Sequence, residues 1–339
     1  MKAQFDAEDN EEYIASDYDS EEDMEDEEDE GFDEEDELVT GGAAKARATP
    51  KDAPEWATLK GFPPATQRSL MAILTKLKGQ NKNELTIMLV GKNGVGKSST
   101  GNSLLNEKVF NVATFQNASP GANVPQMVSR KAGGFTLSVI DTPGLLDGGS
   151  VNEESLRNIC AFVADKTVDA IVYVDRLDTY RVQTVDKQIM EALTQRFGNL
   201  VWSITAFALT HGNVLAPAGM EYKDFVKGRV DSLRAAAKEA AGEQMLEVPC
   251  AVVENGSRCK TNADNEKILN DGVPWLSNFV KVVADLVGDG DVLDVEKALE
   301  GTDVHAKKNR WLVWPMLFAQ IFLLKPLVCK TIEKDPNYN

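Results

Sequence analysis

The chain has 339 residues, enough for one large α/β domain or for two smaller domains with a sizeable core. Its formal net charge of −18 arises from the first 40 residues, which hold 21 of the 54 acidic side chains and a single basic one, Lys2. The rest of the chain is nearly neutral, so the charge argues against nucleic acid as a partner.

Residues 1–54 are expected to form a disordered acidic arm that ends in a linker. Segments such as 21–28, which consist almost entirely of Asp and Glu, repel themselves and offer little apolar surface to bury. The arm either solvates the chain without a partner or attracts basic ligands or basic peptides. Its acidic start also argues against a secretory signal peptide and an Arg-rich transit peptide.

Residues 55–290 alternate between helix and strand patterns, which is typical of an α/β domain. We expect a helix over 66–77 before a first strand at 85–90, and a long polar stretch over 107–126 after the next helix. The pattern predicts a mostly parallel sheet with helices on both faces and with ligand loops at the carboxyl ends of the strands. Further strands are expected at 135–140, 170–174, within 201–209 and at 248–253, and further helices at 155–163, 185–196, 222–241 and from 274 onward.

The strongest local signal is residues 91–99, GKNGVGKSS, which directly follow the first predicted strand. This is the pattern of a phosphate-binding P-loop, in which glycines let successive backbone N–H groups point inward. Lys97 would reach the β- and γ-phosphates, Ser98 would offer its hydroxyl to Mg²⁺, and the helix that begins near Ser98 would add the positive end of its dipole. The alternative is an ordinary Gly-rich turn. The predicted phosphate-binding residues are Asn93, Gly94, Val95, Gly96, Lys97, Ser98 and Ser99.

A second motif, Asp141-Thr142-Pro143-Gly144, stands at the end of the predicted strand 135–140. Alone it is a common turn. At a strand end that follows a P-loop, Asp141 can hold Mg²⁺ through water, and the amide of Gly144 can approach the γ-phosphate. The two motifs together predict a P-loop GTPase-type nucleotide switch.

The motif that would recognise the base departs from the usual one. The usual guanine-reading motif, Asn-Lys-x-Asp, is replaced after the strand within 201–209 by Thr-His-Gly-Asn, with His211 as its histidine. His211 could stack on the base or hydrogen-bond to it, and a carboxylate for the guanine edge could come from Glu254, with Asn255 beside it. The alternative for His211 is a loop histidine with a structural role.

The apolar run 311–329 predicts a transmembrane tail anchor, with a linker at 291–310 and a short tail at 330–339. Its uncharged part covers 14 residues, or 19 if Lys325 snorkels, against the ~20 of a spanning helix. Two tryptophans at its start, a preceding basic cluster and a position close to the C-terminus favour the anchor. The alternatives are an interfacial helix and a packed core helix.

The motifs GKNGVGKSST, DTPGL, VDRLDTYRV, ALTH and ENGSRC resemble those of the chloroplast outer-envelope protein-import receptor GTPases, the Toc GTPases of the paraseptin-like group. The resemblance covers roughly residues 54–326, and FAQIFLLKP is similar to the membrane anchor of the family's small receptor. Because the acidic arm is short and no large C-terminal domain follows the GTPase (G) domain, the small receptor is the closer match.

The resemblance implies that GTP or GDP is bound together with Mg²⁺ and that His211, Glu254 and Asn255 read the guanine. It also implies that a switch segment lies near the nucleotide, with its last residue on the Mg²⁺ side beside Ser98 and Asp141. That segment consists of Ala113, Thr114, Phe115 and Gln116.

Arg181 matches a family arginine that crosses a dimer interface toward the nucleotide of the partner. Without the resemblance it would be interpreted as a surface or helix-capping arginine. We expect Lys97 and Ser98 to be catalytic, and Arg181 either to act in trans or only to hold the dimer together. Intrinsic turnover should be slow, because no obvious glutamine orients the attacking water. One departure from the family stands inside the P-loop, where Asn93 replaces a residue that is commonly glycine.

These expectations describe a membrane-anchored GTPase that acts as a receptor for transit-peptide precursor proteins at the plastid outer membrane, with its G domain facing the cytosol. The expected partners are precursors, a larger receptor GTPase, a channel and a second G domain in a homodimer or heterodimer. One alternative is a membrane-associated septin-like or immune-type scaffold whose nucleotide controls assembly. Another is a soluble P-loop hydrolase whose C-terminal helix packs in the core.

Overall fold

The computed structural model describes residues 53–112, 124–147, 149–288 and 293–294. Most of the predicted acidic arm, the segment from Ala113 to Gln116 and the predicted tail anchor at 311–329 lie outside these ranges. Within them, no helix is both long enough and apolar enough to cross a membrane.

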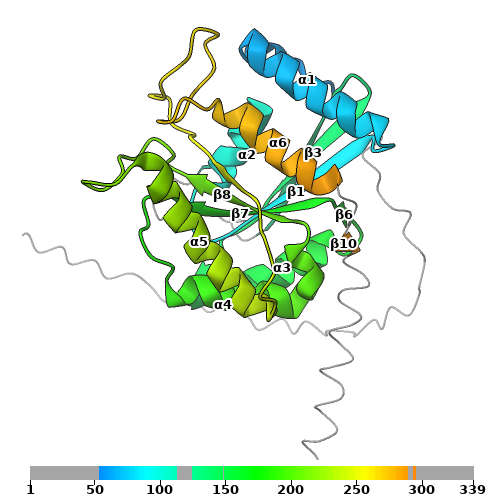
Figure 1. The fold of residues 1–339 in the computed structure, drawn as a ribbon. Coiled ribbons are helices and arrows are strands. Elements are labelled where there is room, and N and C mark those ends of the chain that lie inside the picture. Colours follow the sequence, from blue (N-terminus) through cyan, green and yellow to red (C-terminus); the bar gives the residue numbers. More distant parts are fainter. Residues whose placement is uncertain (1–52, 113–123, 148, 289–292, 295–339) are drawn as a thin grey trace, which may run out of the picture. The chain divides into compact units, whose positions relative to one another are not determined.

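The fold is built on a six-stranded sheet in the order β2-β3-β1-β7-β8-β9 (Figure 1). Neighbouring strands run parallel except β2, which pairs antiparallel with β3. In β1, β3, β7 and β8 nearly every side chain is buried, as expected for strands covered on both faces. The strands are β1 (Glu84–Val90), β2 (Gln126–Ala132), β3 (Phe135–Asp141), β7 (Ala170–Arg176), β8 (Thr205–Thr210) and β9 (Cys250–Val252).

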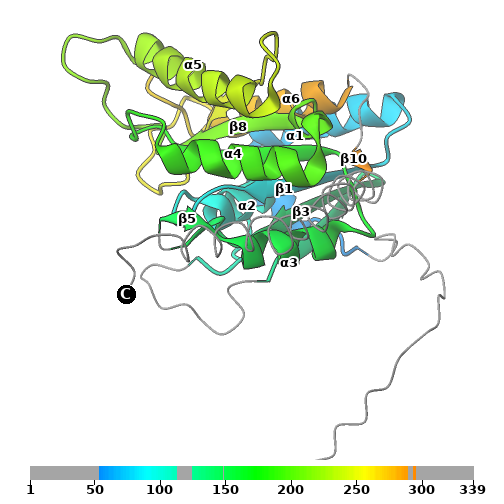
Figure 2. The same cartoon turned by 90° about the horizontal axis from the view of Figure 1, so that it is seen from below.

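Helices cover both faces of the sheet. Helices α1, α2 and α6 lie on one face, and α3, α4 and α5 lie on the other (Figure 1). Helices α4 and α5 run side by side (Figure 2). Short elements complete the described fold: η1 (Ala57–Gly61), η2 (Asn199–Trp202) and the strand pairs β4 (Leu146–Asp147) with β5 (Ser150–Val151) and β6 (Thr167–Val168) with β10 (Leu293–Asp294). The helices are α1 (Pro64–Gly79), α2 (Lys97–Leu105), α3 (Glu153–Val163), α4 (Thr184–Phe197), α5 (Tyr222–Ala241) and α6 (Trp275–Gly288).

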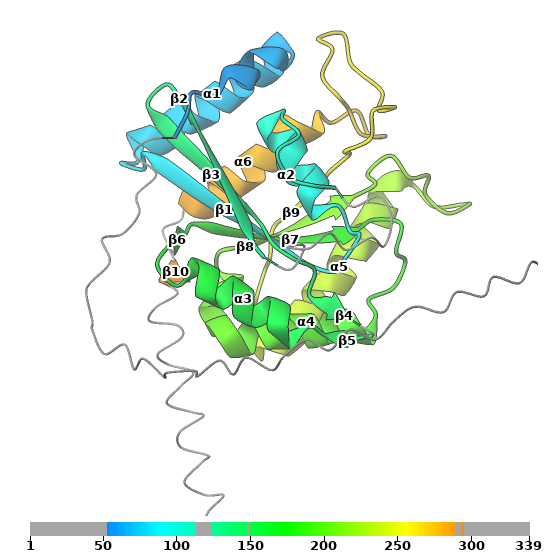
Figure 3. The ribbon, with the colours of Figure 1, turned by 180° about the vertical axis from the view of Figure 1, so that it is seen from behind.

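The predicted elements are present with boundaries shifted by a few residues at most, and the prediction of a mostly parallel sheet with helices on both faces is confirmed. The edge strand β2 was not predicted (Figure 3). Its side chains are mostly half-buried, so the sequence QMVSRKA carries no apolar run. It joins β3 through Gly133 and Gly134, whose φ angles of 58° and 72° suit a tight hairpin turn.

Glu107 joins three separate segments beside the end of α2. Its carboxylate accepts hydrogen bonds from Thr58 Oγ1 at 2.7 Å and from Arg130 Nε at 2.9 Å, and it pairs with the Arg130 guanidinium a second time through Nη2. These contacts connect the chain before α1 and the edge strand β2 to the end of the P-loop helix. The hydrogen bond from Arg130 lowers the pKa of Glu107 below its ordinary value.

Four buried charged side chains connect the loop after β1 with β7, α4 and α5. Asp175 on β7 pairs with Arg229 on α5, and its carboxylate lies 3.5 Å from Lys92 Nζ. Lys92, in the loop after β1, pairs at 2.6 Å with Asp186 on α4. All four side chains are less than a tenth exposed. Burial raises the pKa of Asp175, and the charges of Arg229 and Lys92 oppose that shift. We call these residues the buried charge cluster.

Replacing Arg229 with Met should destabilise the fold by roughly 3–5 kcal/mol, because it leaves the buried Asp175 carboxylate without its closest partner. The measurement is the urea midpoint at neutral pH. Lys227→Met on the same helix is the matched control, because Lys227 pairs with Asp231 on the exposed surface and its removal should leave the midpoint unchanged. Equal midpoints for the two variants would show that the buried pair does not stabilise the fold.

Glu107→Gln should lower the stability at pH 7 but not in acid. Because folding lowers the pKa of Glu107, its carboxylate stabilises the fold above the ordinary carboxyl pKa, and this contribution is lost as the pH falls through the lowered value. Urea midpoints of both proteins from pH 7 to pH 3 should therefore converge at the acidic end. A midpoint difference that stays constant over this range would contradict the assignment.

Candidate nucleotide site

The loop between β1 and α2 has the backbone conformation that a phosphate cradle requires. Gly91, Gly94 and Gly96 have φ angles of 142°, 71° and 100°, in the region that side chains rarely adopt. At position 91 a Cβ would also lie 2.3 Å from the carbonyl oxygen of Val174. The loop delivers the chain directly into α2, whose first residue is Lys97. Backbone N–H groups and the helix N-terminus thus lie together at the carboxyl end of β1.

Lys97 is buried under this loop. Its Nζ donates hydrogen bonds to the carbonyl oxygens of Lys92 at 2.7 Å and of Gly91 at 3.2 Å. Burial lowers the pKa of Lys97 to about 8, although the charge of Asp141 acts in the opposite direction. Because two neutral carbonyls compensate the ammonium charge only weakly, a phosphate within reach would be a much stronger partner.

Ser98 and Asp141, the two residues predicted to serve Mg²⁺, meet at the start of α2. Ser98 Oγ donates a hydrogen bond of 2.6 Å to Asp141 Oδ2, whereas Asp141 Oδ1 is buried and accepts no hydrogen bond. Burial raises the pKa of Asp141, and Ser98 and Lys97 oppose the shift. A hydroxyl and a carboxylate with a spare buried oxygen fit Mg²⁺, which prefers oxygen ligands and takes the remainder from water and phosphate. No cluster of three or more metal-binding side chains occurs in the described ranges.

The loop after Asp141 lies against the phosphate loop. Thr142 Oγ1 donates to the carbonyl of Leu89 at 2.6 Å, and the amide of Leu145 donates to the carbonyl of Gly91 at 3.1 Å. Gly144, which stands between Thr142 and Leu145 in the chain, lies next to Asn93 at the exposed end of the phosphate loop. Gly144 is therefore held beside the phosphate loop, and its predicted approach to the γ-phosphate stays a prediction.

The residues predicted to read the base lie on two adjacent loops. His211 follows β8, with a φ of 59° and its Nδ1 3.1 Å from Thr210 Oγ1. Glu254 follows β9, and its two carboxylate oxygens accept hydrogen bonds from the amides of Asn213 at 2.9 Å and of Gly256 at 2.7 Å. The Glu254 carboxylate thus joins the loop of His211 to the loop after β9, which holds both side chains on the same edge of the sheet.

Asn255 connects these loops with the phosphate loop. Its Nδ2 donates to Thr100 Oγ1 on α2 at 3.0 Å and lies 3.6 Å from where a Cβ on Gly96 would be. Its Oδ1 is buried and accepts no hydrogen bond. Because a buried acceptor without a donor is costly, Asn255 Oδ1 is suited to accept a hydrogen bond from a ligand.

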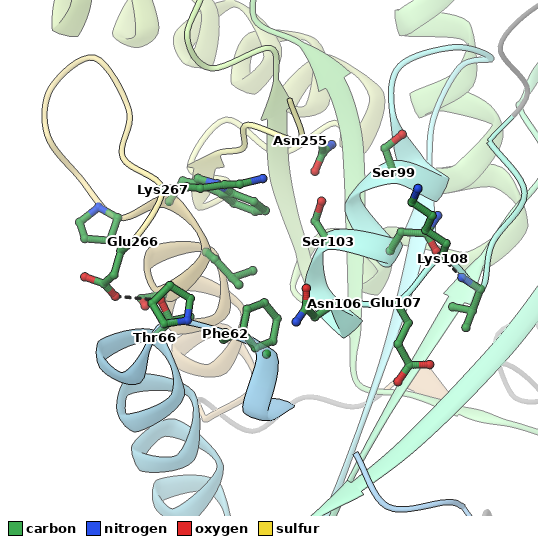
Figure 4. A pocket seen from close by; sticks show the side chains of 18 of the residues that line it. Phe62, Thr66, Ser99, Ser103, Asn106, Glu107, Lys108, Asn255, Glu266 and Lys267 are labelled. Atoms are coloured by element: carbon green, nitrogen blue, oxygen red, sulfur yellow. Dashed lines mark hydrogen bonds between the residues drawn. The ribbon is translucent and has the colours of Figure 1, made fainter. Parts of the chain in front are cut away.

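A cavity of about 1010 Å³ adjoins this site along α2 (Figure 4). Ser99 and Asn255 line its end near the phosphate loop, and Thr66 and Glu266, which share a hydrogen bond of 3.0 Å, line its opposite end. Lys97, Ser98 and Asp141 are not among its lining residues. The cavity is therefore a neighbour of the phosphate site and not the site itself.

Arg181 lies apart from these residues, in the loop between β7 and α4. It is exposed, and the described part of the chain supplies no hydrogen bond or ion pair to its side chain. Ala113, Thr114, Phe115 and Gln116 fall outside the described ranges, so their predicted place beside the nucleotide stays a prediction.

Three residues that support the site were not singled out in the sequence. Lys92 belongs to the buried charge cluster, Thr142 holds the loop after β3, and Thr210 Oγ1 donates to the carbonyl of Val95 in the phosphate loop at 2.7 Å. Each stands within two residues of the carboxyl end of a strand. A polar residue at such a position was the available signal, since ligand loops in parallel sheets start there.

The chain is similar to known proteins in sequence and in fold. The AIG1 family model matches residues 85–247. The chain is 39% identical over 281 residues to Translocase of chloroplast 34 of Pisum sativum, covering 80% of this chain and 89% of that protein. It is also similar to the crystal structure of Toc33 from Arabidopsis thaliana in complex with Mg²⁺ and GMPPNP, with a TM-score of 0.66 and 39% identity over 70% of this chain and 98% of that one.

A second solved structure concerns the chloroplast translocon components atToc33 and psToc159, for whose GTPase activity dimerization is important. It matches with a TM-score of 0.67 and 39% identity over 70% of this chain and 97% of that one. Identity at this level extends over most of the length of the translocase relative as well as of this chain. The chain therefore belongs to the Toc GTPases, the protein-import receptor GTPases of the chloroplast outer envelope.

Proposed function

We propose that this chain is a GTP-switched receptor for precursor proteins at the plastid outer membrane. It hydrolyses GTP to GDP and phosphate and binds the nucleotide together with Mg²⁺. The observation that supports this best is the meeting of three loops at one edge of the sheet. They bring Lys97, the Ser98–Asp141 pair and Asn255 together around α2.

The geometry of the first loop supports the proposed phosphate binding. Lys97 and the backbone amides of Asn93 to Ser99 would hold the phosphates. Ser98 and Asp141 would hold Mg²⁺, which would supply positive charge to offset the charge of the phosphates. The amide of Gly144 approaches the terminal phosphate. Water then attacks the γ-phosphoryl group in line with the leaving oxygen, and Lys97 together with the loop amides stabilises the charge that develops.

Guanine recognition is assigned to His211, Glu254 and Asn255. A carboxylate accepts hydrogen bonds from both N1–H and the 2-amino group of guanine, which adenine cannot offer in the same place. The Glu254 carboxylate is held by two backbone amides and keeps further lone pairs for a ligand. Asn255 Oδ1 adds an acceptor without a donor, and the exposed ring of His211 adds a face for stacking.

The receptor role is supported by similarity to Translocase of chloroplast 34 over most of both chains. In this proposal residues 55–290 form the G domain, which faces the cytosol, and residues 311–329 anchor it in the membrane. The acidic arm over 1–54 assists the capture of transit peptides, because these are basic and poor in acidic residues. Further partners are a larger receptor GTPase and a channel.

A dimer through the G domain is part of the proposal. The exposed side chain of Arg181, together with the importance of dimerization for the GTPase activity of atToc33 and psToc159, supports an arginine that reaches toward a partner's nucleotide. Gln116 would complete the Mg²⁺ side, next to the nucleotide contacts of Ala113, Thr114 and Phe115.

Glu254→Gln should weaken GDP binding by about 10-fold to 100-fold, because a neutral amide cannot accept from both N1–H and the 2-amino group. Inosine diphosphate lacks the 2-amino group, so the variant should also lose most of the preference for GDP over inosine diphosphate. Titration calorimetry with both nucleotides measures the two effects. Glu243→Gln, at an exposed position after α5, is the matched control. An unchanged preference in Glu254→Gln would exclude this residue from guanine reading.

An immobilised transit peptide should bind the full chain several-fold more strongly in one nucleotide state than in the other. The measurement compares retention in GDP with retention in GMPPNP. Lys97→Ala should abolish the difference between the states, because it removes the ammonium that holds the phosphates. Equal and negligible retention in both states would defeat the receptor proposal and would favour a scaffold whose nucleotide controls assembly.

A further inference from the structure

Asn93 occupies the exposed corner where the phosphate loop meets the loop after β3. Its Nδ2 donates a hydrogen bond of 2.8 Å to the carbonyl of Leu146. A Cβ on Gly144 would lie 1.4 Å from Asn93 Oδ1 and 2.3 Å from Asn93 Cγ. The amide of Asn93 therefore packs directly against the α-carbon of Gly144 while it holds the backbone two residues further along.

The other contacts between these two loops lie deeper. Thr142 is 4% exposed and Leu145 is 1% exposed, and their bonds reach the carbonyls of Leu89 and Gly91 at the end of β1. Asn93 and Gly94 are exposed. Asn93 thus supplies the outer contact, and the backbone of Gly144 is held between it and the buried bonds.

The position of Gly144 matters for one part of the nucleotide only. In the proposed site Lys97 and the amides that lead into α2 hold the phosphates common to GDP and GTP, whereas the Gly144 amide serves the terminal phosphate. A side chain that fixes Gly144 therefore acts on the triphosphate more than on the diphosphate.

We propose that Asn93 is a positioning residue that sets the preference of this site for a nucleoside triphosphate over a diphosphate. It does so by holding the Gly144–Leu146 segment against the phosphate loop. The inference rests on the proposed binding of GTP. It assigns the role to the Asn93 side chain, which adds to the contact that the Asn93 backbone nitrogen makes beside Gly144. The Asn93 side chain restrains the segment in two directions: its Nδ2 donates to Leu146, and its amide plane packs against Gly144.

Asn93→Ala tests the role, because it removes the amide group and keeps the backbone restricted. The affinity for GMPPNP divided by the affinity for GDP should fall by about 3-fold to 10-fold, as expected for the loss of one hydrogen bond that orders a binding loop. Both affinities are measured by titration calorimetry on the full chain with Mg²⁺. The matched control is Asn199→Ala, another exposed asparagine with one side-chain hydrogen bond, which should leave the ratio unchanged.

Gly144→Ala supplies a second arm, because its new methyl group would meet the Asn93 side chain and would also lie 2.8 Å from the Asn93 backbone nitrogen. It should lower the same ratio in the otherwise unaltered chain, and lower it by a smaller factor in the Asn93→Ala background, where only the clash with the backbone remains. An unchanged or raised ratio in Asn93→Ala would overturn the inference while leaving GTP binding intact. Failure of the unaltered chain to bind either nucleotide would instead overturn the proposed function, and the inference with it.

Discussion

The buried charge cluster of Lys92, Asp175, Asp186 and Arg229 is the constraint on which the arrangement of this fold depends. Its two cations and two carboxylates balance, so four charges can be buried together without leaving one of them unpaired. The residues come from the phosphate loop, β7, α4 and α5. Because unpaired buried charges are costly, a change in the relative positions of these four elements that separated the pairs would carry a free-energy penalty.

The cluster also separates the roles of the two lysines in the phosphate loop. Lys92 points to carboxylates beneath the loop, where its charge is neutralised. Lys97 is buried among backbone carbonyls, and its pKa falls to about 8 because nothing there compensates its charge fully. The first lysine therefore stabilises the loop, whereas the second keeps a strong preference for an anion. From the sequence alone, Lys92 and Lys97 cannot be told apart in this way, because both are basic residues of one motif.

Much of the fold and the site could be predicted because their signals are local. Apolar runs predicted the buried strands, and helix α5 spans its predicted range. The glycines of the phosphate loop indicated its backbone conformation. The parallel topology then brings His211 and Glu254 together, because the strands before them are neighbours.

The edge strand β2 was missed because half-buried side chains leave no apolar run. The role of Lys92 was missed because its partner Asp186 is distant in sequence, although its position just after β1 was an available signal.

The same cluster bears on the loop that presents Arg181. This loop begins after β7, which contributes Asp175, and ends at α4, where Asp186 accepts a hydrogen bond of 2.8 Å from the amide of Gln183. Both ends are therefore tied to residues that pair with Lys92 in the phosphate loop. The exposed arginine and the phosphate cradle are therefore supported by one set of buried pairs.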